Sequence, residues 1–225
     1  MVELRYYGHS FFKLKDKNVT VLIDPIFDSS KTEFKKQRKI PVLQNDLKNI
    51  SMILLTSEML EHFDKEAVQK LALRDNATVI AHDFILRDMD LPRNLKMPVS
   101  SNTELFLKGV KIKPTTAHCP KSFCPTGFIL DLNGKKIYHA GTTHLLESFS
   151  NMGIDVLLLP ISSRSMDVID AVRATKMIKP KTVIPMQYDL FETDKNDPND
   201  LKRRIGESVL NTQTVILSPG KKFIL

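Results

Sequence analysis

Short apolar runs separated by polar turns make up the first part of the chain. After the polar turn at residues 15–18, a run of β-branched residues favours extended backbone, and Pro25 ends that run. Apolar side chains at helical spacing predict a helix over residues 62–73. Strands are predicted over residues 2–7, 11–14, 19–24, 51–56 and 77–81.

The remainder of the chain repeats this order of hairpins followed by strands and helices. Asn133-Gly134 is the strongest hairpin signal, because both residues readily adopt the positive φ angles of a tight turn. Helices are predicted over residues 166–178 and 202–210. The predicted strands cover residues 105–107, 110–112, 128–132, 136–140, 155–159, 182–185, 214–217 and 223–225. Two such runs predict an α/β (α+β) fold in which two mixed sheets pack together with helices outside.

The composition fits one domain that covers residues 1–225. The chain is 42% hydrophobic over 225 residues, which is enough for a sizeable core. It contains no apolar stretch long enough to cross a membrane, and no signal peptide is visible at its start. Its two cysteines, Cys119 and Cys124, are too few for a disulfide scaffold. We therefore expect a cytoplasmic protein with no membrane attachment.

The basic charge changes this picture only slightly. The formal net charge is +7, but the excess is spread along the chain, as on a solvated lysine-rich surface. The densest cluster, Lys35 to Lys39, lacks the interleaved aromatic residues on which single-stranded nucleic acid stacks. We expect a small molecule or a protein as partner, and at most weak, salt-sensitive binding of nucleic acid.

Seven short motifs occur in a fixed order along almost the whole chain. They are residues 7–10 (YGHS), 22–25 (LIDP), 53–56 (ILLT), 115–118 (TTAH), 137–141 (IYHAG), 157–161 (LLLPI) and 180–188 (PKTVIPMQY). In this order and spacing the chain resembles the metallo-β-lactamase superfamily, and more closely its branch of L-ascorbate-6-phosphate lactonase and related metal-dependent hydrolases. The resemblance implies a four-layer αββα sandwich with the site between the edges of the two sheets. Because the resembling lactonases oligomerise, it also makes a homo-oligomer plausible.

The motif that supplies most metal ligands in the resembling family is degenerate here. Hydrolytic members carry His-x-His-x-Asp-His after the Leu-Leu-Thr strand, and such a turn aims imidazole and carboxylate donors at Zn²⁺ or a similar ion. In this chain Ser57 and Met59 stand where the two leading histidines stand. Glu61 replaces the aspartate, and His62 is retained.

The later ligand positions show the same loss. His118 matches the next family histidine, but Thr142 replaces the bridging aspartate and Gln187 replaces the last histidine. Two of the seven ligand positions are therefore unchanged. Disturbing even a partner of a metal ligand typically costs roughly 10–100-fold in metal affinity or activity. We expect no tightly held cofactor, and Zn²⁺ or Mn²⁺ at low occupancy at most.

The remaining histidines offer a limited replacement for the lost ligands. His144 follows the lost aspartate by two residues, so a rewired single-metal site would use Glu61, His62, His118 and His144. His9 and His139 lie outside the usual ligand set and are interpreted as hydrogen-bonded structural residues. Ser57 is not predicted to be a nucleophile, because no His-Asp arrangement is visible beside it in the sequence.

These losses predict a pseudoenzyme, in which the fold persists and the protein binds a ligand or a partner without hydrolysis. The alternative is a metal-dependent hydrolase with a rewired single-metal site that acts on a phosphoester or a lactone. A second alternative is a weak binder of anionic ligands or nucleic acid. Under each hypothesis the degenerate ligand positions converge on one cleft, at Ser57, Met59, Glu61, His62, His118, Thr142 and Gln187.

Overall fold

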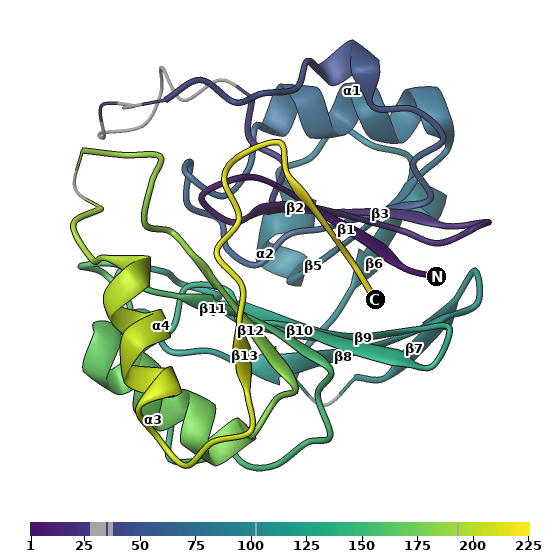
Figure 1. Ribbon diagram of the computed structural model, residues 1–225. Coiled ribbons are helices and arrows are strands. Elements are labelled where there is room, and N and C mark those ends of the chain that lie inside the picture. Colours follow the sequence, from purple (N-terminus) through teal and green to yellow (C-terminus); the bar gives the residue numbers. More distant parts are fainter. Residues whose placement is uncertain (28–34, 36–37, 102, 193) are drawn as a thin grey trace.

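Two seven-stranded mixed β-sheets face each other in the computed structural model, which describes residues 1–27, 35, 38–101, 103–192 and 194–225 (Figure 1). Helices cover the outer face of each sheet, so the layers follow the order helix, sheet, sheet, helix. This arrangement confirms the predicted αββα sandwich. The basic segment at Lys35 to Lys39 lies partly outside the described residues.

The first sheet has the strand order β14-β1-β2-β3-β4-β5-β6. Its strands are β1 (Glu3–Gly8), β2 (Phe11–Lys15), β3 (Thr20–Ile23), β4 (Met52–Leu54), β5 (Thr78–Ala81), β6 (Lys96–Pro98) and β14 (Lys222–Ile224). The helices of this half are α1 (Lys65–Asp75), α2 (Asp83–Arg87) and the 3-10 helices η1 (Gln44–Asp46) and η2 (Arg93–Leu95). The sequence pattern missed α2 and β6, because both are too short to show a clear hydrophobic period.

The second sheet has the strand order β13-β12-β11-β10-β9-β8-β7. Its strands are β7 (Leu105–Leu107), β8 (Val110–Thr116), β9 (Thr126–Leu132), β10 (Lys135–His139), β11 (Val156–Pro160), β12 (Thr182–Met186) and β13 (Gln213–Thr214). The helices α3 (Val168–Ile178) and α4 (Pro198–Gly206) pack on its outer face (Figure 1). No helix among the described residues is long and apolar enough to cross a membrane.

Capping residues decide where the long helices begin. The side chain of Asp64 accepts a hydrogen bond from the backbone N–H of Ala67, so α1 begins at Lys65 and the preceding residues stay in a loop. The prediction that this helix begins at residue 62 was wrong for that reason. The helix α4 begins at Pro198 behind its cap Asp197, four residues before the predicted start, because proline is favoured in the first helical turn.

Alternating side chains divide each sheet between two hydrophobic layers. In β3, Val21 and Ile23 point into the core between the sheets, whereas Leu22 faces the helices outside. The inner core combines residues of both sheets, such as Leu54 of the first and Ile184 of the second. The loops that follow the strands are therefore held against each other by a shared apolar layer.

Candidate functional site

His62 is fully buried in the loop between β4 and α1, and both of its ring nitrogens are engaged. Its Nδ1 lies 2.7 Å from Oδ2 of Asp24, which directly follows β3. Its Nε2 lies 2.8 Å from Oγ1 of Thr142, which follows β10 in the other sheet. The imidazole thus connects a carboxylate of the first half of the chain with a hydroxyl of the second half.

Hydrogen bonds to Asp24 fix the protonation pattern of His62. The backbone N–H of Thr56 donates to Oδ1 of Asp24 at 2.8 Å, and the Thr56 hydroxyl donates to Oδ2 at 2.5 Å. Because an ionised carboxylate only accepts hydrogen bonds, we assign the imidazole proton to Nδ1 of His62. The other ring nitrogen, Nε2, is then an acceptor that faces Thr142.

Gln187 sets the direction of the hydrogen bond between Thr142 and His62. Its Nε2 donates to Oγ1 of Thr142 at 2.8 Å and to Oγ of Ser10 at 2.7 Å. Since the threonine oxygen receives a hydrogen from the amide, its own proton is directed to Nε2 of His62. Hydrogen bonds therefore run in one direction, from Gln187 through Thr142 and His62 to Asp24.

Left-handed backbone conformations at non-glycine residues gather at this site. His9, Asp24 and Gln187 have φ angles of 52°, 48° and 64°. The N–H of Gln187 donates to the carbonyl of His9 at 3.1 Å, which holds two of these residues against each other. The other such residues described are Asn49, Asn76, Lys108, Asn133 and Lys179. Such conformations cost about 1–3 kcal/mol each and are found preferentially at functional sites.

Gly141 allows the backbone to place Thr142 beside His62. Its φ angle is +68°, and an added Cβ would lie 2.6 Å from the carbonyl oxygen of Thr126. The N–H of Thr126 in turn donates to the carbonyl of Thr56 at 2.8 Å. A side chain at position 141 would therefore push apart the segments that carry the site.

His9 is buried beside His62 without a hydrogen bond to either of its ring nitrogens from any described residue. Its ring centroid lies 5.5 Å from that of His62 and 5.0 Å from that of Phe191. Burial holds its pKa well below the usual range, so the ring is neutral at pH 7. The interpretation of His9 as hydrogen-bonded was wrong. For His139 it is confirmed, since that ring contacts the carbonyl of Ser10 at 3.0 Å.

Glu61 pairs with Arg164. Its side chain is 8% exposed and that of Arg164 is 14% exposed, so the ion pair is largely shielded from water. Glu61 belongs to the loop after β4, and Arg164 belongs to the loop between β11 and α3. The pair therefore joins the two halves of the molecule next to the buried histidine.

Ser57 and Glu58 belong to a separate network. Oγ of Ser57 lies 3.1 Å from Oγ of Ser122, and it accepts the N–H of Met59 at 3.2 Å. Glu58 accepts the N–H of Phe123 at 2.6 Å and the hydroxyl of Ser122 at 2.8 Å. These contacts stabilise the turn after β8 and do not involve His62.

His118 and His144 form a pair closer to the surface. Their ring centroids are 5.8 Å apart, His118 is exposed, and its N–H donates to Oγ1 of Thr143 at 2.9 Å. The structure thus brings His62, Thr142 and Gln187 into one network. It places Ser57 and Met59 in a second network, Glu61 in an ion pair, and His118 beside His144.

This donor set does not fit a tightly bound metal ion. Across the described part of the chain, no group of three or more histidine, cysteine, aspartate or glutamate side chains is arranged to hold one. Both ring nitrogens of His62 are already bonded, and Glu61 is paired with Arg164. At the last ligand position, Gln187 presents an N–H donor to Thr142, whereas a metal requires a lone pair.

Asp24, Thr56 and Ser10 are parts of the site that sequence reasoning did not select. All three lie inside motifs that were recognised as family-like, but they were not considered as functional side chains. For Asp24 and Thr56 the signal was a polar residue close behind an apolar strand, where the carboxyl ends of the parallel strands β3 and β4 meet. Ser10 gave no such signal, because it lies in the turn between the antiparallel strands β1 and β2.

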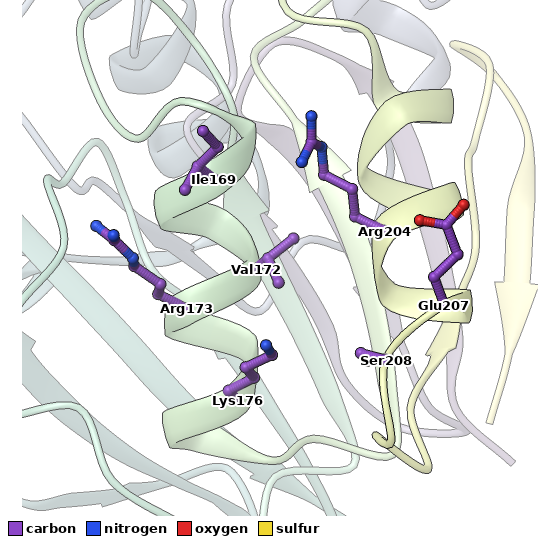
Figure 2. A pocket seen from close by; sticks show the side chains of 7 residues that line it. All are labelled: Ile169, Val172, Arg173, Lys176, Arg204, Glu207 and Ser208. Carbon is purple, nitrogen blue, oxygen red and sulfur yellow. The ribbon is translucent and has the colours of Figure 1, made fainter.

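A surface pocket of about 350 Å³ lies apart from this network, between α3 and α4 (Figure 2). Three basic side chains line it, from Arg173, Lys176 and Arg204. Two of them already have acidic partners on their own helices, since Arg173 pairs with Asp170 and Arg204 pairs with Asp200. None of the residues that contact His62 lines this pocket.

Known proteins resemble this chain over its whole length. A protein named UPF0173 metal-dependent hydrolase from Pyrobaculum islandicum is 29% identical over 97% of this chain and 98% of its own. The structure of Igni18, described as a novel metallo hydrolase from Ignicoccus hospitalis, superposes with a TM-score of 0.84 at 26% identity, covering 100% of this chain and 99% of that one. An isothiocyanate hydrolase from Delia radicum gut bacteria shares the fold, with a TM-score of 0.79 at 17% identity over 99% of this chain and 98% of that one.

These relatives correct the prediction of a pseudoenzyme. The full-length relatives are named metal-dependent hydrolases and Igni18 is described as a metallo hydrolase, so the hydrolase alternative fits the findings better than loss of hydrolysis does. Residues 3–187 match the family described as Beta-lactamase superfamily domain. Together with the two-sheet sandwich, this match shows that the chain belongs to the metallo-β-lactamase superfamily.

Proposed function

We propose that the protein is a hydrolase that cleaves an ester bond, in a lactone or a phosphoester, with His62 as general base. The observation that carries the proposal is the buried chain of hydrogen bonds from Asp24 through His62 to Thr142. Full-length relatives named hydrolases support the same reaction class.

The geometry suits proton transfer at Nε2 of His62. Asp24 holds the ring through Nδ1 and stabilises the positive charge that the ring acquires when it takes up a proton. A general base placed in this way typically accelerates a reaction by roughly 10²–10⁴-fold. Because Thr56 satisfies the remaining acceptors of Asp24, the carboxylate is held in place without a metal ion.

The proposed reaction does not depend on a tightly held metal. The relatives are named metal-dependent hydrolases, but the donors that this chain offers do not form a metal site among the described residues. We therefore expect activity to survive exhaustive treatment with a chelator. Zn²⁺ or Mn²⁺ bound weakly near His118 and His144 would not be required for turnover.

Within the superfamily, we propose that the protein lies near the lactonase branch and acts in the cytoplasm. The seven motifs that it shares with that branch support the first statement. Cys119 and Cys124 are free and buried, which suits a reducing compartment.

A substrate panel tests this function. The purified full-length chain is assayed with aryl esters, simple γ- and δ-lactones and an aryl phosphodiester, each with and without EDTA. We expect hydrolysis of at least one class, unaffected by EDTA, and a loss of at least about 10³-fold in His62→Asn. His82→Asn is the matched control, because His82 caps α2 and asparagine is also a good capping residue.

Two results contradict the proposal. The first is a folded wild-type protein that hydrolyses none of the three classes. The second is a folded His62→Asn variant that is as active as the wild type.

A further inference from the structure

Thr142 places a hydroxyl group next to the proposed general base, His62. We propose that Thr142 is a covalent nucleophile, so that the protein hydrolyses carboxylic esters or lactones through an acyl-threonine intermediate. This inference rests on the proposed hydrolase function and names its substrate class. It departs from the metal-bound hydroxide on which hydrolysis in the resembling family depends.

The three side chains have the mutual geometry of a nucleophile, a base and an orienting carboxylate. Oγ1 of Thr142 lies 2.8 Å from Nε2 of His62, and Nδ1 of the same ring lies 2.7 Å from Asp24. Both distances fall within the range of about 2.6–3.2 Å at which a base takes a proton from a hydroxyl nucleophile. The same roles recur on unrelated folds in different chain orders, so order along the sequence does not argue against them.

The hydrogen bond from the Gln187 amide to Thr142 indicates that the threonine hydroxyl is reactive and not only a packing group. The amide donates to Oγ1 of Thr142, so the threonine proton points to His62. The same hydrogen bond stabilises negative charge on Oγ1 as that proton leaves. Ser10 accepts the second hydrogen of the amide at 2.7 Å, and this contact holds Gln187 in the required orientation.

His9 provides a second, independent observation that points to a ligand. Neutral imidazole carries one N–H, and in His9 this donor is buried with no acceptor from any described residue. An unsatisfied buried polar group destabilises the fold, and an acceptor on an incoming ligand relieves that penalty. We assign His9 as a donor to the carbonyl oxygen of the substrate, beside the ring of His62.

The charges at the site favour a carboxylic ester over a phosphodiester. A phosphate group is best held by cationic side chains such as arginine. Arg164, near this site, is paired with Glu61. His9 and Gln187 are neutral hydrogen-bond donors. His9 is assigned to the substrate carbonyl, and Gln187 donates to the nucleophile Thr142. Such donors suit the oxyanion that develops on an uncharged carbonyl group.

The reaction balances with water as the second reactant. Oγ1 of Thr142 attacks the carbonyl carbon while its proton moves to Nε2 of His62. The tetrahedral adduct collapses, the bond between carbon and the leaving oxygen breaks, and that oxygen takes the proton from His62. Water then attacks the acyl-threonine, giving its proton to His62, and the bond between carbon and Oγ1 breaks. His62 returns the proton to Thr142, and the products are a carboxylic acid and an alcohol, or one hydroxy acid from a lactone.

Intact-protein and peptide mass spectrometry test the nucleophile directly. The full-length chain is treated with p-nitrophenyl acetate and with a β-lactone, and turnover of both is followed in parallel. We expect an acyl group on the peptide that contains Thr142 in the wild type and in Thr142→Ser. We expect none in Thr142→Val, whose turnover falls at least about 10³-fold. Thr182→Val is the matched control, because Thr182 is buried to a similar extent in β12.

The outcomes separate this inference from the proposed function. If folded Thr142→Val hydrolyses the esters within tenfold of the wild-type rate, water is the nucleophile and the inference fails, while the proposed function stands. Continued turnover without any adduct in wild type or Thr142→Ser also overturns the inference. Acylation of Thr142 without turnover of any substrate class supports the nucleophile and overturns the proposed hydrolase. Thr142→Ser keeps the hydroxyl, so its activity guards against a fold defect in the valine variant.

Discussion

Two carboxylates near the buried histidine each accept several hydrogen bonds, Asp24 directly after β3 and Glu58 within the loop between β4 and α1. Asp24 accepts bonds from the backbone and hydroxyl of Thr56 and from the ring of His62. Glu58 accepts bonds from Phe123, from Ser122 and, at 3.2 Å, from the thiol of Cys124. Judged by satisfied acceptors alone, the two sites look equivalent.

The two carboxylates differ in whether their hydrogen-bond partners connect to a further group that can exchange a proton. The partner of Asp24 is the imidazole of His62, whose second nitrogen lies beside Thr142. When Nε2 of His62 takes up a proton, Asp24 at Nδ1 stabilises the positive charge on the ring. The partners of Glu58 have no further connection of this kind. Burial and the neighbouring carboxylate raise the pKa of Cys124 to about 12, so the thiol remains protonated. A well-bonded carboxylate therefore indicates chemistry only when its partner can pass a proton onward.

The largest expected effect is that of Asp24→Asn. An asparagine amide can donate to Nδ1 of His62, and the ring then carries its proton on Nε2, where it cannot accept one from Thr142. We expect kcat to fall by about 10⁴-fold, as for similar changes in other enzymes with this arrangement. Steady-state kinetics measure the loss. A folded variant with more than a tenth of wild-type activity would remove Asp24 from the mechanism.

Gln187→Glu tests the direction of the hydrogen bonds with almost no change in shape. A carboxylate accepts the proton of Thr142 and so competes with His62, whereas the native amide donates to Oγ1. We expect kcat to fall by about 10²-fold with little change in KM, as when one stabilising donor is lost. Gln187→Met, which lacks both donor and acceptor, should lose activity to a similar degree. An active methionine variant would show that the amide is dispensable.

Glu58→Gln should change stability and leave the chemistry intact. Burial alone would raise the pKa of Glu58, but hydrogen bonds from Phe123, Ser122 and Cys124 outweigh it and lower the pKa. The charged form is thus favoured in the fold, and this stabilisation is lost as the pH falls through the lowered pKa. At pH 7 we expect the variant to lose about 1 kcal/mol of unfolding free energy, because water partly screens this half-buried carboxylate, with kcat close to that of the wild type. A large loss of kcat would end the distinction between the two carboxylates.

Asp194 extends the comparison to a carboxylate with few donors. Burial raises its pKa to about 6, and the hydrogen bond from the N–H of Phe191 opposes that shift. The folded protein therefore binds this proton more tightly than the unfolded chain. Its contribution to stability is greatest below pH 4 and is lost as the pH rises to about 6. We expect Asp194→Asn to raise the unfolding free energy by about 1 kcal/mol at pH 7.5, because water partly screens the carboxylate. Thermal melts should show no gain at pH 4, and a gain of equal size there would contradict this assignment.

Hydrophobic periodicity predicts most of the fold because each sheet has one face on the shared core and one under helices. Runs such as β4 and β11 are apolar throughout, so their existence is clear from the sequence. Their ends are less clear. The start of α4 was missed because Pro198 was not recognised as the first residue of a helix.

The site was only partly accessible to the same reasoning. The positions of His62, Thr142 and Gln187 after strands suggest a common edge, since parallel strands end together. Their chemistry depends on which atom donates to which, and this follows from side-chain rotamers and from the left-handed backbone at Asp24 and Gln187. Neither the rotamers nor these backbone angles can be predicted from the spacing of residues along the sequence. Asp24, His62 and Thr142 also lie far apart along the chain, so no local pattern reveals them as a group.

The pairing of β14 with β1 has a consequence for synthesis in the cell. Lys222 of β14 and Glu3 of β1 are 219 positions apart, yet their strands pair side by side. At about 5–20 residues per second, translation takes roughly 10–40 s to reach β14 after β1 is made. During that time one edge of β1 lacks its partner strand, and an open edge can pair with another chain. The ribosome-bound intermediate is therefore the state in which we expect chaperones to matter most for this protein.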